Sequence, residues 1–247
     1  KENDRRYNKK SLGQILKTKI FCDIADIKQI KKFNKKTLVK GFTTNPSLIR
    51  KAGAKDYKSY CKKILKICKN KPVSFEVFAD DYQNMKRQAL LINKWAKNVY
   101  VKIPVVNSKG LFMGKLIKEL NNKRIKLNIT AVYTSKQTKE ILNNINKKTK
   151  IIISIFAGRM ADTGKDPVPE FKNSLRLAKK YKNVEILWAS TREPYNFLQT
   201  KQLKCHIITA PPSVILKIEK FGKSFQKLTT DTVKGFLVDS KKSRFKI

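Results

Sequence analysis

Histidine is nearly absent from this sequence, and its cysteines are few and unpaired. The only histidine is His206, and none of the four cysteines, Cys22, Cys61, Cys68 and Cys205, belongs to a C-x-x-C pair. Zinc sites need several such ligands at short, characteristic spacings. The sequence therefore argues against a zinc site, and we predict no metal ligands. We expect reduced, buried thiols in a cytoplasmic protein.

Long apolar runs and a glycine-rich phosphate loop are also missing. No stretch approaches the 18 or more apolar residues of a membrane span, and the basic N-terminus has no apolar signal core. No G-x-G-x-x-G sequence occurs, so a dinucleotide has no recognisable loop to bind. We therefore predict no membrane partner and no cofactor.

Acidic residues are scarce, with 18 Asp and Glu against 57 Lys and Arg, which gives a net charge of +39. Such a charge favours polyanions. However, 48 of the basic residues are lysines scattered along the chain, whereas recognition of bases and phosphates often uses the arginine fork. Abundant Lys, Asn and Ile are also typical of an AT-rich genome. We predict no specific nucleic-acid partner and only weak, salt-sensitive DNA binding. A lysine-rich, polyanion-binding barrel remains the non-enzyme alternative.

What the sequence does contain is a series of short apolar runs separated by lysine-rich amphipathic segments. Buried parallel strands have this appearance, and a helical pattern after each run is typical of β-α units. The length of 247 residues matches one (β/α)8 TIM barrel of about 250 residues. An open doubly wound sheet is the alternative. The runs are Lys19–Ile24, Leu38–Phe42, Val73–Phe78, Val99–Ile103, Ile125–Thr130, Ile151–Phe156, Val184–Ala189 and Cys205–Thr209.

The pattern predicts one domain over residues 1–247. Residues 1–18 precede the first strand as an N-terminal extension, and residues 223–247 form a C-terminal helix and tail. The apolar stretch Val233 to Val238 should pack as part of that helix. Helix-opening residues follow several strands, among them Asp26, Asn45-Pro46, Asp80-Asp81, Asn107-Ser108, Thr134-Ser135 and Pro211-Pro212.

Polar residues cluster at the predicted carboxyl ends of the strands, where barrel enzymes carry their chemistry. Taken singly, each has an ordinary explanation: Lys102 is one of many lysines, and Asp23 or Asn45 can cap a helix. Together, they place charges inside a barrel, which costs desolvation free energy unless the groups pair or react. We therefore predict an active site there, formed by Asp23, Asn45, Glu76, Lys102, Asn128, Thr130, Ser154, Arg159, Ser190 and Arg192.

Several motifs resemble the transaldolase and fructose-6-phosphate aldolase family, in its order and spacing from about Ile20 to the last helix. The most specific is Thr43-Thr44-Asn45-Pro46-Ser47, which resembles the family's TTNPS motif. The others are Phe21-Cys22-Asp23, Val101-Lys102-Ile103-Pro104, Asn128-Ile129-Thr130 and Ser154-Ile155-Phe156-Ala157-Gly158-Arg159.

The resemblance implies a cofactor-free Schiff-base mechanism. Lys102 would attack a ketone and form an imine, Asp23 would act as the general acid and base, and Glu76 with Thr130 would hold the water for proton transfer. Asn45, Asn128 and Ser154 would orient the sugar, and Arg159, Ser190 and Arg192 would bind its phosphate. The chemistry itself requires an unprotonated lysine and a nearby carboxylate. Relatives of this short type are often ring-shaped, so we expect a homo-oligomer.

Some residues depart from the family pattern. At three positions the chain does not have the residue that is usual in the family: Ile24, Ile155 and Thr191. Glu76 resembles transaldolases, whereas Tyr133 resembles fructose-6-phosphate aldolases and belongs to the predicted substrate-binding set. The predicted function is transfer of a dihydroxyacetone unit between sugar phosphates. Aldol cleavage that releases dihydroxyacetone, and a diverged aldolase of carbohydrate biosynthesis, are the alternatives.

Overall fold

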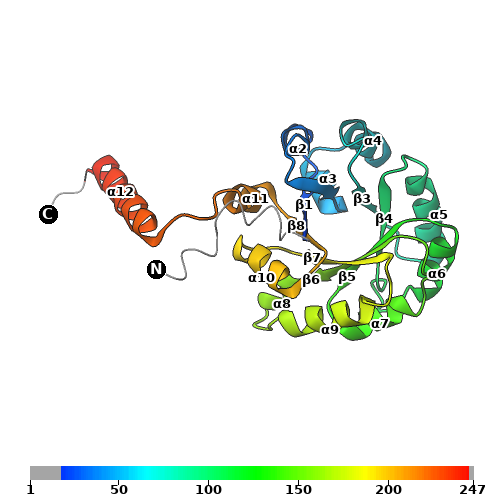
Figure 1. The fold of residues 1–247 in the computed structure, drawn as a ribbon. Helices are drawn as coiled ribbons and strands as arrows, with labels where there is room; N and C mark the ends of the chain where they lie inside the picture. Colours follow the sequence, from blue (N-terminus) through cyan, green and yellow to red (C-terminus); the bar gives the residue numbers. More distant parts are fainter. Residues whose placement is uncertain (1–17, 245–247) are drawn as a thin grey trace. The chain divides into compact units, whose positions relative to one another are not determined.

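The chain folds into a closed barrel of parallel strands, β1 to β8, which follow one another around the barrel in chain order. The structure is a computed structural model that describes residues 18–244. Figure 1 shows the strands at the centre with helices around them. The strands are β1 Lys19–Asp23, β2 Val39–Thr43, β3 Val73–Glu76, β4 Val99–Pro104, β5 Leu127–Val132, β6 Ile151–Phe156, β7 Val184–Ala189 and β8 Ile207–Ala210.

At least one helix follows every strand, as the sequence predicted for a TIM barrel. The helices of the barrel are α2 Ile27–Asn34, α3 Pro46–Lys51, α4 Tyr57–Ile67, α5 Tyr82–Asn93, α6 Gly114–Asn122, α7 Ser135–Leu142, α8 Ala157–Ala161, α9 Val168–Ala178, α10 Tyr195–Leu203 and α11 Pro212–Ile218. The predicted fold class is confirmed.

The chain divides into two compact units. One contains the barrel and runs to residue 215, and the described residues from 216 onwards belong to the other. In the second unit, the predicted C-terminal helix is present as α12, Phe225–Ser243, which Ser224 caps. The apolar stretch Val233 to Val238 lies within this helix, as predicted, and none of the residues of α12 is buried. The predicted N-terminal extension lies outside the described residues except for Thr18.

Strand bounds agree with the sequence where Ile, Val and Leu dominate. β6 and β7 occupy the predicted ranges, and five of the six residues in each are buried. β5 runs beyond Thr130 to Val132 because its pairing with β6 shifts after Ile129. Ala131 has a φ of 58° at this irregularity, a left-handed conformation that only the surrounding pairing makes tolerable.

Helix caps agree with the sequence except after β4. The side chains of Asp26, Asp81 and Thr134 accept hydrogen bonds from the first turns of α2, α5 and α7. Asn107 was expected to open a helix, and that expectation is wrong. Its side-chain oxygen instead accepts hydrogen bonds from the backbone of Lys109 and Leu111, so it forms a turn, and α6 begins only at Gly114.

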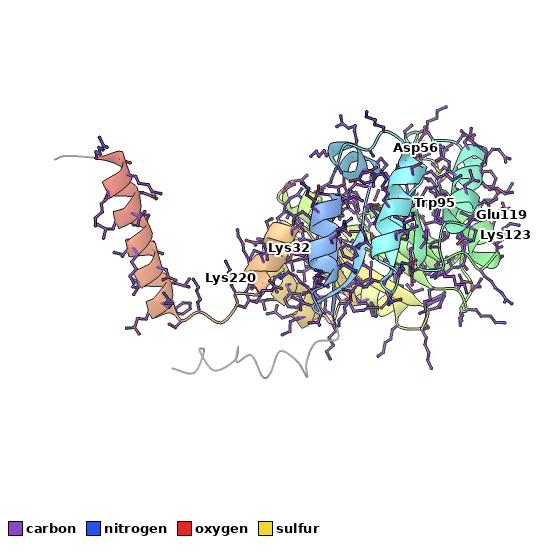
Figure 2. The ribbon with its side chains drawn as sticks, turned by 90° about the horizontal axis from the view of Figure 1, so that it is seen from above. Lys32, Asp56, Trp95, Glu119, Lys123 and Lys220 are labelled. Atoms are coloured by element: carbon purple, nitrogen blue, oxygen red, sulfur yellow. The ribbon has the colours of Figure 1, made fainter. Side chains whose placement is uncertain are left out.

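Lysine side chains extend from the outer surface of the barrel. Figure 2 shows Lys32 on α2 and Lys123 at the end of α6 among them, and both are exposed. Within residues 18–244, no helix is long and apolar enough to cross a membrane.

Candidate active site

A polar hollow of about 220 Å³ opens at the carboxyl ends of the strands. Nine of the eleven predicted site residues line it: Asp23, Asn45, Lys102, Asn128, Thr130, Ser154, Arg159, Ser190 and Arg192. Parallel strands place their carboxyl ends at one end of a barrel, which is why residues as far apart in the chain as Asp23 and Arg192 meet here. The other two, Glu76 and Tyr133, contact residues of the hollow without lining it.

Lys102 is the buried cation of the hollow, with only 6% of its surface exposed. Its Nζ donates a hydrogen bond of 2.8 Å to the backbone oxygen of Thr44 and lies 3.2 Å from a carboxylate oxygen of Glu76. Glu76 and Lys102 are direct partners in the register of β3 and β4, so neighbouring strands hold the pair together. A buried charge of this kind is tolerated because it has a hydrogen-bond acceptor and a counter-ion.

Asp23 lies at the end of β1 beside this pair. Thr43 Oγ1 donates a hydrogen bond of 2.7 Å to Asp23 Oδ1 and lies 2.5 Å from Thr209 Oγ1. Burial raises the pKa of the Asp23 carboxyl, while the positive charge of Lys102 and the Thr43 hydrogen bond oppose the rise and Glu76 adds to it. A carboxyl with a raised pKa holds a proton more readily than an ordinary aspartic acid, which suits a group that takes up and returns a proton in general acid–base catalysis.

A chain of hydrogen bonds fixes the floor of the hollow. Ser154 Oγ donates to Asn128 Oδ1 at 2.6 Å, and Asn128 Nδ2 donates to Ser74 Oγ at 3.1 Å. Thr130 Oγ1 is buried and has no hydrogen-bond partner among the described residues. A buried hydroxyl normally has a partner, so Thr130 has bonding capacity for a bound molecule.

The arginine side of the hollow depends on a close backbone approach. Arg159 N donates a hydrogen bond of 3.1 Å to Ser190 Oγ, which links α8 to the residues after β7. A Cβ on Gly158 would lie 1.7 Å from Ser190 O, so only glycine fits. Ser190 itself has a φ of 61°, a strained conformation for a residue other than glycine. Such strain is typical of functional sites.

Arg192 is held by a carboxylate that the sequence did not single out. Its Nε lies 3.2 Å from both carboxylate oxygens of Asp162, and its Nη2 lies 2.5 Å from one of them. The guanidinium beside Asp162 lowers the pKa of that carboxyl. Both side chains are about half exposed, which limits the stabilisation that the pair gives. Its effect is to fix the direction of Arg192 at the rim.

Asn45 and Tyr133 have structural contacts beside their predicted roles. Asn45 caps α3, because its Oδ1 accepts a hydrogen bond of 2.9 Å from Leu48 N. The ring of Tyr133 packs on Phe156, with 5.9 Å between ring centroids, and Phe156 lines the hollow. The ordinary explanation for Asn45 is therefore correct, and it does not prevent the side chain from lining the hollow.

Sequence reasoning missed Thr43, Thr209 and Asp162 as contributors to this site. Thr43 lies within the motif that resembles TTNPS, but of that motif only Asn45 was among the predicted site residues. Thr209 is the polar residue near the end of the eighth apolar run, and the rule that found the other strand-end residues could have found it. Asp162 follows Arg159 by three positions, and its contact with Arg192 depends on tertiary structure alone. No group of three or more potential metal ligands occurs within residues 18–244.

A buried lysine, two carboxylates and two arginines at the carboxyl end of a closed β/α barrel are the features of a barrel enzyme. Comparison with known proteins identifies which kind. Residues 20–247 match the family model described as transaldolase/fructose-6-phosphate aldolase. The chain therefore belongs to the transaldolase/fructose-6-phosphate aldolase family and is an enzyme of sugar phosphate metabolism.

Individual relatives agree with the family assignment. The chain is 33% identical over 222 residues to a protein of Herpetosiphon aurantiacus named "Probable transaldolase", which covers 90% of this chain and 94% of the relative. It is 34% identical over 230 residues to a protein of the same name from Brucella melitensis, covering 93% and 99%. A thiamine phosphate pyrophosphorylase from Pyrococcus furiosus shares the fold, with a TM-score of 0.52, 8% identity and coverage of 80% and 87%.

Proposed function

We propose that this enzyme transfers a dihydroxyacetone unit between sugar phosphates through an imine on Lys102. The observation that carries the proposal is the position of the Lys102 amine. It is buried, lies 3.2 Å from Glu76, and shares one hollow with Asp23 and two arginines. These are the groups that ketone activation, proton transfer and phosphate binding require.

The first stage of the proposed reaction is imine formation. Lys102 must lose a proton before its nitrogen can attack the ketone carbon, and Glu76 is the carboxylate within ion-pair distance. In the proposal Glu76 takes up this proton. The attack gives a carbinolamine, whose hydroxyl group takes the proton from Glu76 and leaves as water, so that a protonated imine remains. Thr130, with its unpartnered hydroxyl, supports this stage by binding the water or the substrate. Because the imine nitrogen is positively charged, it can accept electrons from the adjacent carbon skeleton.

The second stage is carbon–carbon cleavage. Asp23 removes a proton from the substrate hydroxyl, and an aldehyde leaves as the electrons of the broken bond move to the imine and form an enamine. An acceptor aldehyde then adds to the enamine in the reverse sequence, and Asp23 returns the proton. Water finally hydrolyses the new imine and frees Lys102. The raised pKa of Asp23 suits both directions of this proton transfer.

The remaining residues of the hollow would position the substrate. We assign the phosphate to Arg159, Arg192 and Ser190, which lie together on one side. Asn45, Asn128 and Ser154 offer hydrogen bonds to the sugar hydroxyls. Binding energy from a distant phosphate holds the reacting carbons against Lys102 and Asp23, which favours reaction. We retain the cytoplasmic homo-oligomer expected from the sequence as part of the proposal.

Aldol cleavage that releases free dihydroxyacetone is the second candidate, and Tyr133 favours it. The Tyr133 ring packs on Phe156 at the wall of the hollow. A phenolic hydroxyl can donate a proton. If the Tyr133 hydroxyl protonated the enamine, free dihydroxyacetone would be released before an acceptor aldehyde arrived.

Borohydride reduction tests the mechanism, because it converts an imine into a stable secondary amine. With a ketose phosphate present, we expect added mass on the peptide that contains Lys102. Lys102→Arg should abolish both labelling and turnover, because guanidinium stays protonated. Lys126→Arg is the matched control, since Lys126 is a partly buried lysine that donates to a backbone oxygen away from the hollow. Labelling of a different lysine would refute the assignment.

A coupled assay then separates the two candidates. With a ketose phosphate and an aldose phosphate acceptor, a transaldolase forms a new ketose phosphate, whereas an aldolase forms free dihydroxyacetone whether or not the acceptor is added. We expect product formation to depend on the acceptor.

A further inference from the structure

A second hollow, which is rich in lysines, lies at the amino-terminal end of the barrel, opposite the candidate active site. Its volume is about 670 Å³, within the range of about 300–1,000 Å³ typical of ligand pockets. It lies where β1, β6, β7 and β8 begin. Six of the twelve residues that line it are lysines: Lys19, Lys147, Lys148, Lys150, Lys179 and Lys182.

The positive charge of this hollow is nearly uncompensated. Glu185 is its single acidic lining residue, and Lys19 lies 2.5 Å from it. Among the described residues, no carboxylate lies within ion-pair distance of Lys148, Lys150, Lys179 or Lys182. Like charges gathered in this way repel one another, so a bound anion would relieve the repulsion.

The chain's general lysine excess does not explain this concentration, because a hollow on the side of the barrel lacks it. The hollow beside Trp95 has one lysine, one arginine and one aspartate among its lining residues, although lysines are common on the helices around it. A second hollow at the amino-terminal end, of about 490 Å³, is lined by Lys69, Lys97, Lys126 and Lys150 and by no acidic residue. Lys150 belongs to both hollows of this end.

Charge repulsion across this end affects Lys126. Its pKa is lowered, mainly because the side chain is partly buried and also because Lys150 is positively charged. The two hollows therefore form one basic surface, which we call the basal lysine surface. It comprises Lys19, Lys69, Lys97, Lys126, Lys147, Lys148, Lys150, Lys179 and Lys182.

The floor of the larger hollow is held by hydrogen bonds. Asn183 Nδ2 donates to the backbone oxygens of Asn146 and Thr149, at 2.9 and 2.7 Å, and so joins the segments that precede β6 and β7. His206 Nδ1 accepts a hydrogen bond of 3.0 Å from Ile186 N. The proton of the neutral ring is therefore on Nε2, where it is a donor. Burial lowers the pKa of His206, in agreement with a neutral ring.

We propose that the basal lysine surface binds a ligand that carries several linked phosphate groups, at a site separate from the active site. Lysine is a point-like donor that suits phosphate oxygens from many directions. Arginine, the usual reader of nucleic-acid bases, is absent from the described lining of both hollows. A concave site with lysines on several sides fits a short phosphate chain better than a rod-like duplex. Tripolyphosphate and a nucleoside triphosphate share this chemistry.

Calorimetric titration of the full chain at physiological salt tests the proposal. Tripolyphosphate and ATP should bind with similar affinity, whereas adenosine should not bind. The triple variant Lys148→Gln, Lys179→Gln, Lys182→Gln should lose affinity by at least about tenfold. The matched control is Lys28→Gln, Lys31→Gln, Lys32→Gln, which removes the same charge from exposed positions of α2. The affinity of this control variant for tripolyphosphate should be within about twofold of that of the parent chain.

Four results would overturn the proposal. An equal loss in the α2 control would mean that general electrostatic attraction causes the binding. Binding of ATP but not of tripolyphosphate would mean that the base, and not the phosphates, is recognised. Tighter binding of duplex DNA than of tripolyphosphate would make the surface a nucleic-acid site instead. Loss of binding in Arg192→Ala would place the ligand in the active site and would also contradict the proposal.

Lysine acetylation of the native protein gives an independent measurement that needs no variant. Tripolyphosphate should protect Lys148, Lys150, Lys179 and Lys182, while Lys32 should acetylate at the same rate with and without it. Equal protection of Lys32 and the basal lysines, or protection of neither, would contradict the proposal. Turnover of sugar phosphates by the Lys148, Lys179 and Lys182 triple variant should match that of the parent chain, because the site is at the opposite end of the barrel. Because turnover and tripolyphosphate binding are measured separately, a failure of the proposed phosphate site can be told apart from a failure of the proposed function.

Discussion

Thr209 on β8 and Thr43 on β2 are joined through their hydroxyl groups, whose oxygens lie 2.5 Å apart. Thr43 donates its hydroxyl hydrogen to Asp23, so Thr209 must be the donor between the two threonines. Successive hydrogen bonds of this kind strengthen one another. The eighth strand thereby influences the carboxyl that we propose as general acid and base.

Replacing Thr209 should therefore affect catalysis at a distance from the substrate. In Thr209→Val, the Thr43 hydrogen bond that lowers the pKa of Asp23 should weaken, so this pKa should rise further. The acidic limb of the profile of kcat/KM against pH should move to higher pH, and kcat should fall roughly fivefold, equivalent to about 1 kcal/mol. Thr200→Val, which removes another buried hydroxyl, is the control, and its profile should keep its position. If the acidic limb keeps its position in both variants, Thr209 contributes to packing and not to the pKa of Asp23.

The burial of Asp23 should also reduce stability near neutral pH. Its pKa is raised in the folded protein, so the folded state holds this proton more strongly than the unfolded chain does. The resulting stabilisation is complete below the pKa of the unfolded chain and is lost as pH rises through the folded value. Asp23→Asn cannot ionise, so it should be more stable than the parent at pH 7, by about 1 kcal/mol, with a smaller difference near pH 4. Denaturant unfolding at both pH values measures this, and a destabilised variant at pH 7 would contradict it.

The close contact between Gly158 and Ser190 predicts strong sensitivity to a single methyl group. In Gly158→Ala, the new Cβ would lie 1.7 Å from Ser190 O and 2.9 Å from Arg192 Cγ, so α8 or the segment after β7 must move. We expect a stability loss of about 1–3 kcal/mol and a raised KM for phosphorylated substrates. Gly235→Ala is the control, because nothing lies within 4 Å of its Cβ and alanine favours the helix by about 0.5–1 kcal/mol. Equal thermal stability of the two variants would contradict the prediction.

The sequence predicted the barrel well because apolar runs and helix caps are local signals. β6 and β7 have the predicted bounds because most of their residues are apolar and buried. The irregularity at Ala131 was not predictable, because it arises from how β5 pairs with β6. Strand-end chemistry revealed most of the residues that line the hollow. The pairing of Arg192 with Asp162 was not predictable, because it joins residues 30 positions apart through tertiary structure.

Arg192 should matter for phosphorylated substrates in particular. Removing its side chain in Arg192→Ala should cost about 1.5–3 kcal/mol in kcat/KM for a ketose phosphate, the size of a charged hydrogen bond. The loss should be small for free dihydroxyacetone, which has no phosphate. Arg176→Ala is the control, because Arg176 is an exposed residue of α9 whose guanidinium donates a hydrogen bond to Asn173. Equal losses for both substrates would refute a phosphate role.

A substitution of Asp162 also tests the assignment of Arg192 to phosphate binding. Asp162→Asn keeps the shape of the side chain and removes its charge, so Arg192 loses its counter-ion but keeps an acceptor. We expect phosphate binding to change by less than in Arg192→Ala. Because Asp162 fixes the direction of Arg192, KM for a ketose phosphate should rise in steady-state kinetics. A fall in KM would mean that Asp162 only competes with the substrate phosphate.

Tyr133 should set the balance between transfer and simple aldol cleavage. Its hydroxyl can supply a proton to the enamine, which would release free dihydroxyacetone before an acceptor captures it. Tyr133→Phe keeps the ring contact with Phe156, whose centroid lies 5.9 Å away, and removes only the donor. The enamine should then persist longer, so the ratio of transaldolase to aldolase turnover should rise. Glu76→Gln should slow both reactions, because the ion pair with Lys102 serves both. Both rates should be measured on one ketose phosphate. An unchanged ratio in Tyr133→Phe would assign Tyr133 to packing and leave the choice of reaction to other residues of the hollow.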